Sequence, residues 1–496
     1  MQANKAIIIG SGIAGMATAI RLAVEGYQVD VFEANDYPGG KLSVFEKHGF
    51  RFDAGPSLFT QPQNIEDLFK LANEPIEKFF NYKSVEIACS YFFENGKQVI
   101  AYTDKQKLTK EFSEKLGEDI TAVTKYLSSA EKLYNNIGTV FLNHSLHKRN
   151  TWLHQRVFKA LSSIKFSYLF GSLNQHNNNK FKSPEAVQIF NRFATYNGSN
   201  PYKAPGMLSL IPHLEQNQGT FYPEGGMISI TNALYQLALK KSVTFHFNHK
   251  VTKITEHAGV VNGIVANGKD IESDLVISNS DVYYTYKNLL NDLPQTNKLS
   301  RLERSSSALI FYWGINKEFK ELGLHNILFG KEYKEEFDHL FNSKTLSDDP
   351  TVYINISSKM EAAHAPENNE NWFVMINAPA NVGQDWDAII TEARRSIIEK
   401  INRILKIDIE QYIISETIMD PVLIEQKTNT YQGSLYGTSS NTKFAAFFRP
   451  ANFTSKIKGL YFCGGTVHPG GGIPLCLKSA YITAELIKTD DARKRK

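Results

Sequence analysis

The chain has few cysteines and no long apolar run. Its three cysteines, Cys89, Cys463 and Cys476, are wrongly spaced for a zinc knuckle, and their odd number argues against a disulfide framework. This pattern favours a reducing, cytoplasmic compartment. No stretch reaches the ~18 uninterrupted apolar residues of a transmembrane helix, and the N-terminal run Ala6-Ile7-Ile8-Ile9 is too short for a signal peptide. We therefore expect a protein of the cytoplasm that is soluble or lies on a membrane surface.

A strong surplus of one charge and the familiar hydrolytic motifs are also missing. The 496 residues carry 55 Lys and Arg against 51 Asp and Glu, a net charge of +4 that is too small to indicate a nucleic-acid partner. The sequence contains no Gly-x-Ser-x-Gly elbow, no P-loop and no Cys/His cluster with metal-ligand spacing. Serine hydrolysis, phosphoryl transfer and metal catalysis therefore lack the residues they need, and no metal site is predicted.

The first residues contain a nucleotide-binding pattern. The apolar run 6–9 meets Gly10-Ser11-Gly12-Ile13-Ala14-Gly15, and a helical pattern follows. In a strand, glycine turn and helix of this kind, the glycines permit a tight turn, close approach of a pyrophosphate and close helix packing. A second predicted strand, 27–32, leads into Glu33-Ala34, where a carboxylate can hydrogen-bond a ribose. We expect an α/β fold with a Rossmann-like dinucleotide site.

A second glycine-rich connection between strand and helix lies near the other end of the chain. The predicted strand 459–463 is followed by five glycines around His468-Pro469 and then by a helical pattern over 475–486. Proline suits a first helical turn, and the glycines leave backbone amides bare for a ligand. The candidate binding residues in this block are Gly465, Thr466, Gly472, Ile473 and Pro474.

Two further motifs, Pro38-Gly39-Gly40-Lys41-Leu42 and Phe52-Asp53-Ala54-Gly55-Pro56-Ser57, make the chain similar to the two-dinucleotide-binding-domain flavoproteins. This resemblance implies FAD as the tightly held nucleotide. It implies that Gly39, Gly40, Lys41 and Leu42 lie near the flavin and that Gly55, Pro56, Ser57 and Val251 also belong to the site. Val251 falls in a predicted strand and hairpin at 250–268 and would meet the adenine side through its backbone.

Over most of its length the chain resembles the bacterial-type carotenoid desaturases, the phytoene desaturase family. The motifs that carry the resemblance are Arg192-Phe193-Ala194-Thr195-Tyr196, Pro201-Tyr202-Lys203-Ala204-Pro205, Tyr222-Pro223-Glu224-Gly225-Gly226-Met227, Asn279-Ser280-Asp281-Val282, His325-Asn326-Ile327, Phe447-Arg449-Pro450 and the C-terminal glycine block. The resemblance implies an FAD enzyme that takes a hydride and a vicinal proton from a lipophilic carotenoid and leaves a C=C bond. It implies oxygen or a quinone as the electron acceptor.

The residue after Pro474 favours one branch of this family. It is Leu475, where the phytoene branch commonly has glycine, and the block is more similar to the hydroxycarotenoid 3,4-desaturase branch. The expected reaction is therefore desaturation at C3–C4 of a 1′-hydroxylated acyclic or monocyclic carotenoid. The alternatives are successive desaturation of phytoene, another FAD-dependent carotenoid oxidase or ketolase, an amine oxidase and a carrier without enzymatic activity. The sequence does not indicate an oligomeric state.

The chain is expected to divide into interleaved domains. Residues 1–105, 220–290 and 440–496 would form the FAD-binding domain, 106–219 a helical region that contacts substrate and membrane, and 291–439 an α+β substrate domain.

One stretch has an unusual charge pattern. Between Lys132 and Pro184 there is no Asp or Glu, while seven Lys and Arg are present, and apolar residues at 153, 157, 161, 164 and 168 fall on one face of a predicted helix. A basic amphipathic helix is typical of membrane-surface binding, although a core-facing helix with a solvated basic face has the same pattern. We predict a peripheral association with the membrane.

No acid or base for the reaction is assigned from the sequence. His468 lies in the C-terminal glycine block, and His213 and Glu215 lie in a segment that the resemblance gives to the substrate domain. For each of the three, we favour a structural hydrogen-bonding role over a catalytic one. Because the polyene stabilises its own cation, a weak base or water would suffice.

Overall fold

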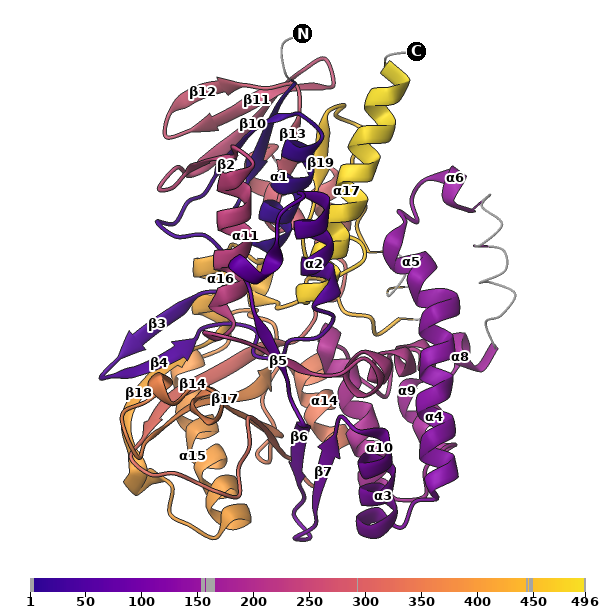
Figure 1. Cartoon of the computed structure of the whole chain (residues 1–496), viewed down its shortest axis with the longest axis vertical. Coiled ribbons are helices and arrows are strands. Elements are labelled where there is room, and N and C mark those ends of the chain that lie inside the picture. Colours follow the sequence, from indigo (N-terminus) through magenta and orange to yellow (C-terminus); the bar gives the residue numbers. More distant parts are fainter. Residues whose placement is uncertain are drawn as a thin grey trace.

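The structure is a computed structural model that describes residues 4–152, 157, 166–291, 293–442, 445 and 449–494. It is elongated, with a parallel sheet in its upper half, a larger mixed sheet in its lower half and a group of helices at one side (Figure 1). Both described chain ends lie at the same end of the molecule, beside the parallel sheet (Figure 1).

The parallel sheet is assembled from distant parts of the chain. Its order is β19-β13-β1-β2-β9, and its strands are β1 (Lys5–Ile9), β2 (Gln28–Phe32), β9 (Thr244–His246), β13 (Val276–Ser278) and β19 (Leu460–Phe462). Ala6 to Ile9 are buried because β1 lies at the centre of the sheet with both faces covered, which explains an uninterrupted apolar run. The strand, turn and helix expected at the N-terminus and the α/β fold are confirmed.

Helices cover this sheet and present their N-termini to one edge. Helix α1 (Ile13–Val24) packs between α17 (Ile473–Lys494) and α11 (Ile228–Lys240), with α2 (Gln63–Leu71) alongside. The apolar side chains of these helices and of the strands form one core cluster, which includes Ile8, Met16 and Leu477. Both α1 and α17 follow glycine-rich turns, so their first turns face the same region.

A seven-stranded mixed sheet forms the lower half. Its order is β18-β14-β17-β16-β15-β6-β7, with β6 (Ile87–Phe92), β7 (Gln98–Tyr102), β14 (Ser307–Ile315), β15 (His325–Leu328), β16 (Val352–Ile356), β17 (Glu370–Ala378) and β18 (Ile413–Met419). Successive side chains of β14 point to opposite faces. Leu309, Phe311 and Trp313 share a core cluster with residues of α15 (Trp386–Leu405), whereas Ala308 and Ile310 line a large cavity on the other side.

The first expected segment, 1–105, spans both sheets. Strands β6 and β7 pair with each other, and β6 adds to β15 in parallel register, with Ser90 opposite Asn326. These two strands therefore extend the sheet of the lower half and not the parallel sheet. The expected domain division stays a prediction.

Three smaller sheets complete the β-structure of the described residues. They are β3 (Val44–Lys47) with β4 (Phe50–Asp53), β5 (Tyr82–Ser84) with β8 (Phe221–Pro223), and the meander β10 (Val251–His257), β11 (Val260–Ala266) and β12 (Lys269–Glu272). The last of these matches the strand and hairpin expected at 250–268.

The helical side of the molecule contains α3 (Lys105–Leu116), α4 (Ile120–Leu133), α5 (Thr139–Asn143), α6 (Arg149–Trp152), α8 (Phe166–Phe170), α9 (Leu173–Asn178) and α10 (Pro184–Asn191). Asp104 and Asp119 cap α3 and α4 by accepting hydrogen bonds from Lys107 N and Thr121 N. Short helices α12 (Val282–Tyr284), α13 (Gln295–Ser300), α14 (Tyr333–Asp338) and α16 (Pro421–Thr428) complete the fold.

The amphipathic helix expected around 153–168 lies almost wholly outside the described residues, which include the flanking helices α6 and α8. Within the described ranges, every helix is too short or too polar to span a bilayer.

Candidate active site

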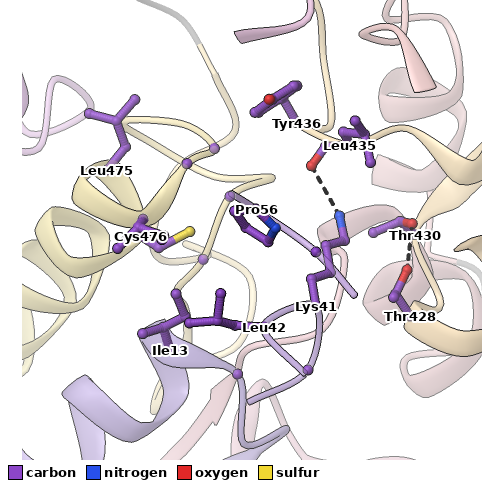
Figure 2. A pocket seen from close by; sticks show the side chains of 18 of the residues that line it. Ile13, Lys41, Leu42, Pro56, Thr428, Thr430, Leu435, Tyr436, Leu475 and Cys476 are labelled. Atoms are coloured by element: carbon purple, nitrogen blue, oxygen red, sulfur yellow. Dashed lines mark hydrogen bonds between the residues drawn. The ribbon is translucent and has the colours of Figure 1, made fainter. Parts of the chain in front are cut away.

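A cavity of about 1420 Å³ lies between the carboxyl edge of the parallel sheet and the mixed sheet. Its wall combines the turn after β1, the end of β2, the N-terminus of α17, strands of the mixed sheet and residues of the helical side. Figure 2 shows the part of the wall where Ile13, Lys41, Leu42, Pro56 and Cys476 come together from four segments. Every residue predicted for the FAD site lines this cavity except Ser11 and Gly15, which lie behind the turn.

The turn after β1 is shaped for close approach of a ligand. Gly10 has φ +95°, and a Cβ added to Gly15 would lie 2.3 Å from the carbonyl oxygen of Gly10. Gly12 occupies the N-cap of α1, and no side chain caps the helix. The first backbone N–H groups of α1 therefore remain available to an anion.

Glu33 is held rigidly at the end of β2. Its Oε2 accepts hydrogen bonds from the N–H and the hydroxyl of Ser11, both at 2.8 Å. Its Oε1 accepts from the backbone and side-chain N–H groups of Asn35 at 2.9 and 3.0 Å. The carboxylate is 6% exposed and lines the cavity with Ala34. Ser11 therefore contributes to the site by fixing the position of the Glu33 carboxylate.

The two loops that the flavoprotein resemblance singled out lie against each other. Gly39 N donates to Ser11 O at 2.9 Å, and a Cβ on Gly55 would lie only 1.8 Å from the Lys41 carbonyl oxygen. Lys41 Nζ donates to Leu435 O at 3.0 Å (Figure 2). Burial lowers the pKa of Lys41, and the charge of Asp281 opposes this shift.

The C-terminal block closes the same wall. Thr466 Oγ1 accepts from Val282 N at 3.0 Å, and Gly472, Ile473 and Pro474 line the cavity where α17 begins. Val251, at the start of β10, is 6% exposed and lines the cavity from the meander. Leu475 also lines it, and in Figure 2 its side chain lies farther from Lys41 than the sulfur of Cys476 does.

Sequence reasoning missed Arg449, a buried cation in this wall. Its Nη1 donates to Tyr436 O at 2.6 Å, and its Nη2 has no hydrogen-bond partner among the described residues. Burial lowers the pKa of Arg449 to about 10, so the guanidinium is charged at neutral pH. In the sequence Arg449 belongs to the family motif Phe447-Arg449-Pro450 without a role of its own. Only its neighbours in space show that it belongs to the site.

The three candidate acid–base residues have different positions. His468 lines the cavity, but its Nε2 lies 2.9 Å from Phe141 O and 3.0 Å from His144 O, and burial lowers its pKa to about 4. The ring is therefore neutral and ties the C-terminal block to the helical side. His213 does not line the cavity and bonds to Asn217 and Gln218. Glu215 does line it and forms an ion pair with Arg192 at 3.0 Å.

Comparison with known proteins was made at the levels of family, sequence and structure. A family described as flavin-containing amine oxidoreductases matches residues 13–488. A 1-hydroxycarotenoid 3,4-desaturase from Flavobacterium sp. (strain P99-3) is 49% identical over 99% of this chain and 100% of its own length. A 4,4'-diapolycopene oxygenase from Methylomonas sp is 30% identical, with 98% of each chain covered. A phytoene desaturase from Fusarium fujikuroi is 30% identical over 98% of this chain and 90% of its own length.

Solved structures share the fold at low identity. An oxidoreductase from Methanosarcina mazei superposes with a TM-score of 0.63 at 17% identity, covering 98% of this chain and 100% of its own. A triple mutant of putrescine oxidase gives a TM-score of 0.63 at 13% identity, with 98% and 99% covered. At these identities the likeness concerns the fold alone.

Proposed function

This chain belongs to the flavin-containing amine oxidoreductase family, and we propose that it is the member of that family that desaturates a 1-hydroxylated carotenoid at C3–C4. It is an FAD-dependent oxidoreductase. The observation that carries the proposed reaction is the 49% identity, over the full length of both chains, to a 1-hydroxycarotenoid 3,4-desaturase. The phytoene desaturase and the diapolycopene oxygenase are much less similar, at 30%.

The residues of the cavity fit FAD. The uncapped N-terminus of α1 suits a pyrophosphate, because Gly10 and Gly12 line the cavity there without side chains, and Glu33 suits a ribose. The unpartnered Nη2 of Arg449 and the amine of Lys41 supply positive charge where the loops meet α17. When bound there, FAD would supply the two-electron acceptor for a hydride from the polyene.

The rest of the cavity suits a long apolar substrate. Its wall on the helical side is apolar and includes Ile137, Phe141, Leu146, Met207, Leu208 and Ile211. These side chains exclude water and hold a stiff polyene in one direction, which positions a single bond for reaction. The wall residue Leu475 supports a site for one terminal bond, because its bulk at α17 restricts how far the polyene can advance.

The substrate also indicates where the protein works. A carotenoid dissolves in lipid, so we infer that the protein works peripherally at the cytoplasmic surface of a membrane and passes electrons to oxygen or a quinone. The acid-free stretch between Lys132 and Pro184 supports this, as do Trp152 and Phe170, two large apolar side chains within it that are 37% and 45% exposed.

The test is anaerobic mixing of the FAD-loaded protein with a 1-hydroxylated acyclic carotenoid and, separately, with phytoene. We expect the hydroxylated substrate to reduce the flavin and its own absorption to shift to the red, because one conjugated bond is added. Rapid conversion of phytoene with the hydroxylated carotenoid untouched would reject the proposed substrate. Oxygen incorporation into a terminal methyl group under air would instead favour an oxygenase.

A further inference from the structure

A buried polar cluster interrupts the apolar wall of the cavity. Arg192 Nη2 lies 3.0 and 3.2 Å from the two carboxylate oxygens of Glu215, and these residues are only 7% and 1% exposed. Tyr196 accepts from Arg192 Nη1 at 2.8 Å and donates to Glu215 Oε2, and the hydroxyl of Tyr91 accepts from Arg192 Nη2 at 2.7 Å. Arg192, Tyr196 and Glu215 all line the cavity.

His325, on β15, faces the same cavity with a free donor. Its Nδ1 lies 3.2 Å from Asn355 Nδ2, which also donates to Leu324 O at 3.0 Å and so is a donor here. The lone pair of Nδ1 is thereby used, and the proton of the neutral ring resides on Nε2. Nε2 is buried and has no hydrogen-bond partner among the described residues, and His325 lines the cavity at 3% exposure.

Buried polar groups of this kind are costly without a ligand. A buried donor without a hydrogen-bond partner destabilises the fold, and a buried ion pair seldom stabilises a fold by itself. Arg192 Nε is a second buried donor without a described partner. Around them the wall is apolar, so the cluster offers one defined place for a small polar group on an otherwise apolar ligand.

The cluster adjoins the predicted flavin loops. The hydroxyl of Tyr353 lies 2.7 Å from His325 Nδ1 and 2.7 Å from the hydroxyl of Ser57, in the loop 55–57. His325 is therefore two hydrogen bonds away from a predicted FAD residue. In a 1-hydroxycarotenoid, the carbon that bears the hydroxyl is two bonds from C3, so the hydroxyl also has to lie close to the reacting C3–C4 bond.

We propose that Arg192, Tyr196, Glu215 and His325 form the binding site for the tertiary hydroxyl of the substrate. This inference rests on the proposed function. A hydroxyl donates one hydrogen bond and accepts two. The free N–H groups of His325 and Arg192 can donate hydrogen bonds to its oxygen. Its O–H can donate a hydrogen bond to Tyr196 or to Glu215, which also accepts from Gln216 Nε2 at 2.8 Å. This contact fixes how far the polyene enters the cavity, and so places the C3–C4 bond in the reacting position.

Two conservative variants test this site without leaving a charge unpaired. In His325→Phe, the neighbours retain other partners, because Tyr353 keeps Ser57 and Asn355 keeps Leu324. In Tyr196→Phe, Arg192 and Glu215 keep each other. The matched control is Tyr222→Phe, which changes a buried tyrosine that does not line the cavity and whose hydroxyl has no hydrogen-bond partner among the described residues. FAD content and thermal unfolding are measured first to establish that each variant is folded.

The measurement is the rate and the saturation constant of anaerobic flavin reduction, with an acyclic 1-hydroxycarotenoid and with the same polyene lacking the hydroxyl. For both variants we expect the ratio of the limiting reduction rate to the saturation constant to fall roughly 10- to 100-fold on the hydroxylated substrate. It should stay within about twofold on the other polyene, since that substrate makes no bond for the variants to lose. Tyr222→Phe should leave both values unchanged.

Other outcomes overturn the inference in distinguishable ways. If the wild-type protein reduces its flavin with neither polyene, the proposed function fails and the hydroxyl site fails with it. If the wild type reacts but both variants lose equally on the two substrates, the cluster is structural or takes part in the chemistry, and only the hydroxyl site is rejected. Unchanged kinetics in both variants reject it as well.

Discussion

The charged residues in the cavity wall differ in how many hydrogen bonds and ion pairs stabilise their charge. Glu33 accepts four hydrogen bonds, whereas among the described residues neither Lys41 nor Arg449 forms an ion pair. Both cations hydrogen-bond to backbone carbonyls, with Lys41 Nζ on Leu435 and Arg449 Nη1 on Tyr436. The wall therefore carries a local positive surplus, which suits the phosphates of FAD and a flavin that gains negative charge on reduction.

Changing Arg449 to Gln should lower the reduction potential of the bound flavin. Removing a buried positive charge disfavours the more negative reduced state, and a tenfold change in the equilibrium corresponds to about 30 mV for a two-electron couple. We expect a shift of at least that size toward negative values, measured with a reference dye. Arg301→Gln, at an exposed position, is the matched control. An unchanged potential in Arg449→Gln would place the guanidinium away from the flavin.

Changing Glu33 to Gln should weaken FAD binding. The amide accepts fewer and weaker hydrogen bonds than the carboxylate, so both the ribose contact and the position of Ser11 suffer. We expect the dissociation constant, measured by titrating the apoprotein, to rise roughly 10- to 100-fold. Asp36→Asn removes a neighbouring charge at an exposed position and should bind FAD normally. Wild-type affinity in Glu33→Gln would exclude this residue from the ribose site.

At the scale of elements, the glycine turn after β1 is held in place by the residues packed behind it. Asn279, at the end of β13, contacts the turn, and its Oδ1 would lie 2.7 Å from a Cβ on Gly12. Asn279 Nδ2 donates to Cys463 O at 3.1 Å, which joins the turn after β1 to the end of β19. Three strands of the parallel sheet thus support one phosphate-sized space.

The segment between α6 and α8 should bind anionic membranes. We expect the quadruple change of Arg149, Arg156, Lys159 and Lys165 to Glu to abolish co-sedimentation with anionic liposomes, because each basic residue near such a surface contributes about 1 kcal/mol. Lys148 is left unchanged, since it forms an ion pair with Asp490 and lies 4.1 Å from the ring centroid of Phe453.

The control for this experiment makes the same charge change elsewhere. Lys253, Lys269, Lys320 and Lys331 are exposed and lie on other elements. Their quadruple change to Glu should leave liposome binding almost intact. Equal loss in the two quadruple variants would show that net charge, and not this segment, determines the binding.

At the scale of the whole molecule, the helical side, the mixed sheet and the parallel sheet meet around buried neutral histidines. His325 lies in the mixed sheet, and His468 bonds from the C-terminal block to the helical side. Burial lowers the pKa of His325 to about 3 and that of His468 to about 4, from an ordinary value of 6.5. The unfolded chain therefore takes up protons below pH 6.5 that the folded chain does not bind.

Folding stability should consequently be complete above pH 6.5 and fall as the pH drops from there toward 4. At pH 5 the loss is about 2 kcal/mol for each such histidine. We expect the drop in Tm between pH 7.5 and pH 5.0 to be smaller in His468→Gln than in the wild type, whatever the Tm of the variant at pH 7.5. His257→Gln, at an exposed position, should keep the wild-type drop. Parallel pH curves for His468→Gln and the wild type would contradict this assignment.

The sequence by itself determined the parts of the site whose physics is local. A strand, a glycine turn and a helix need only neighbouring residues, so the segment 10–15, Glu33 and the block 464–474 could be identified from spacing. The branch of the family was also indicated by a few residues, and the 49% identical relative bears this out.

Only the tertiary structure decided which distant residues share the cavity. Arg192 and Glu215 are 23 residues apart on separate helical turns, and His325 comes to them on a strand of another part of the chain. Strands β6 and β7 read as ordinary β-segments, and their place in the mixed sheet depends on β15, more than 200 residues away. Neither the register between such strands nor the partner of a buried charge is encoded locally, because both depend on how the whole chain closes around its core.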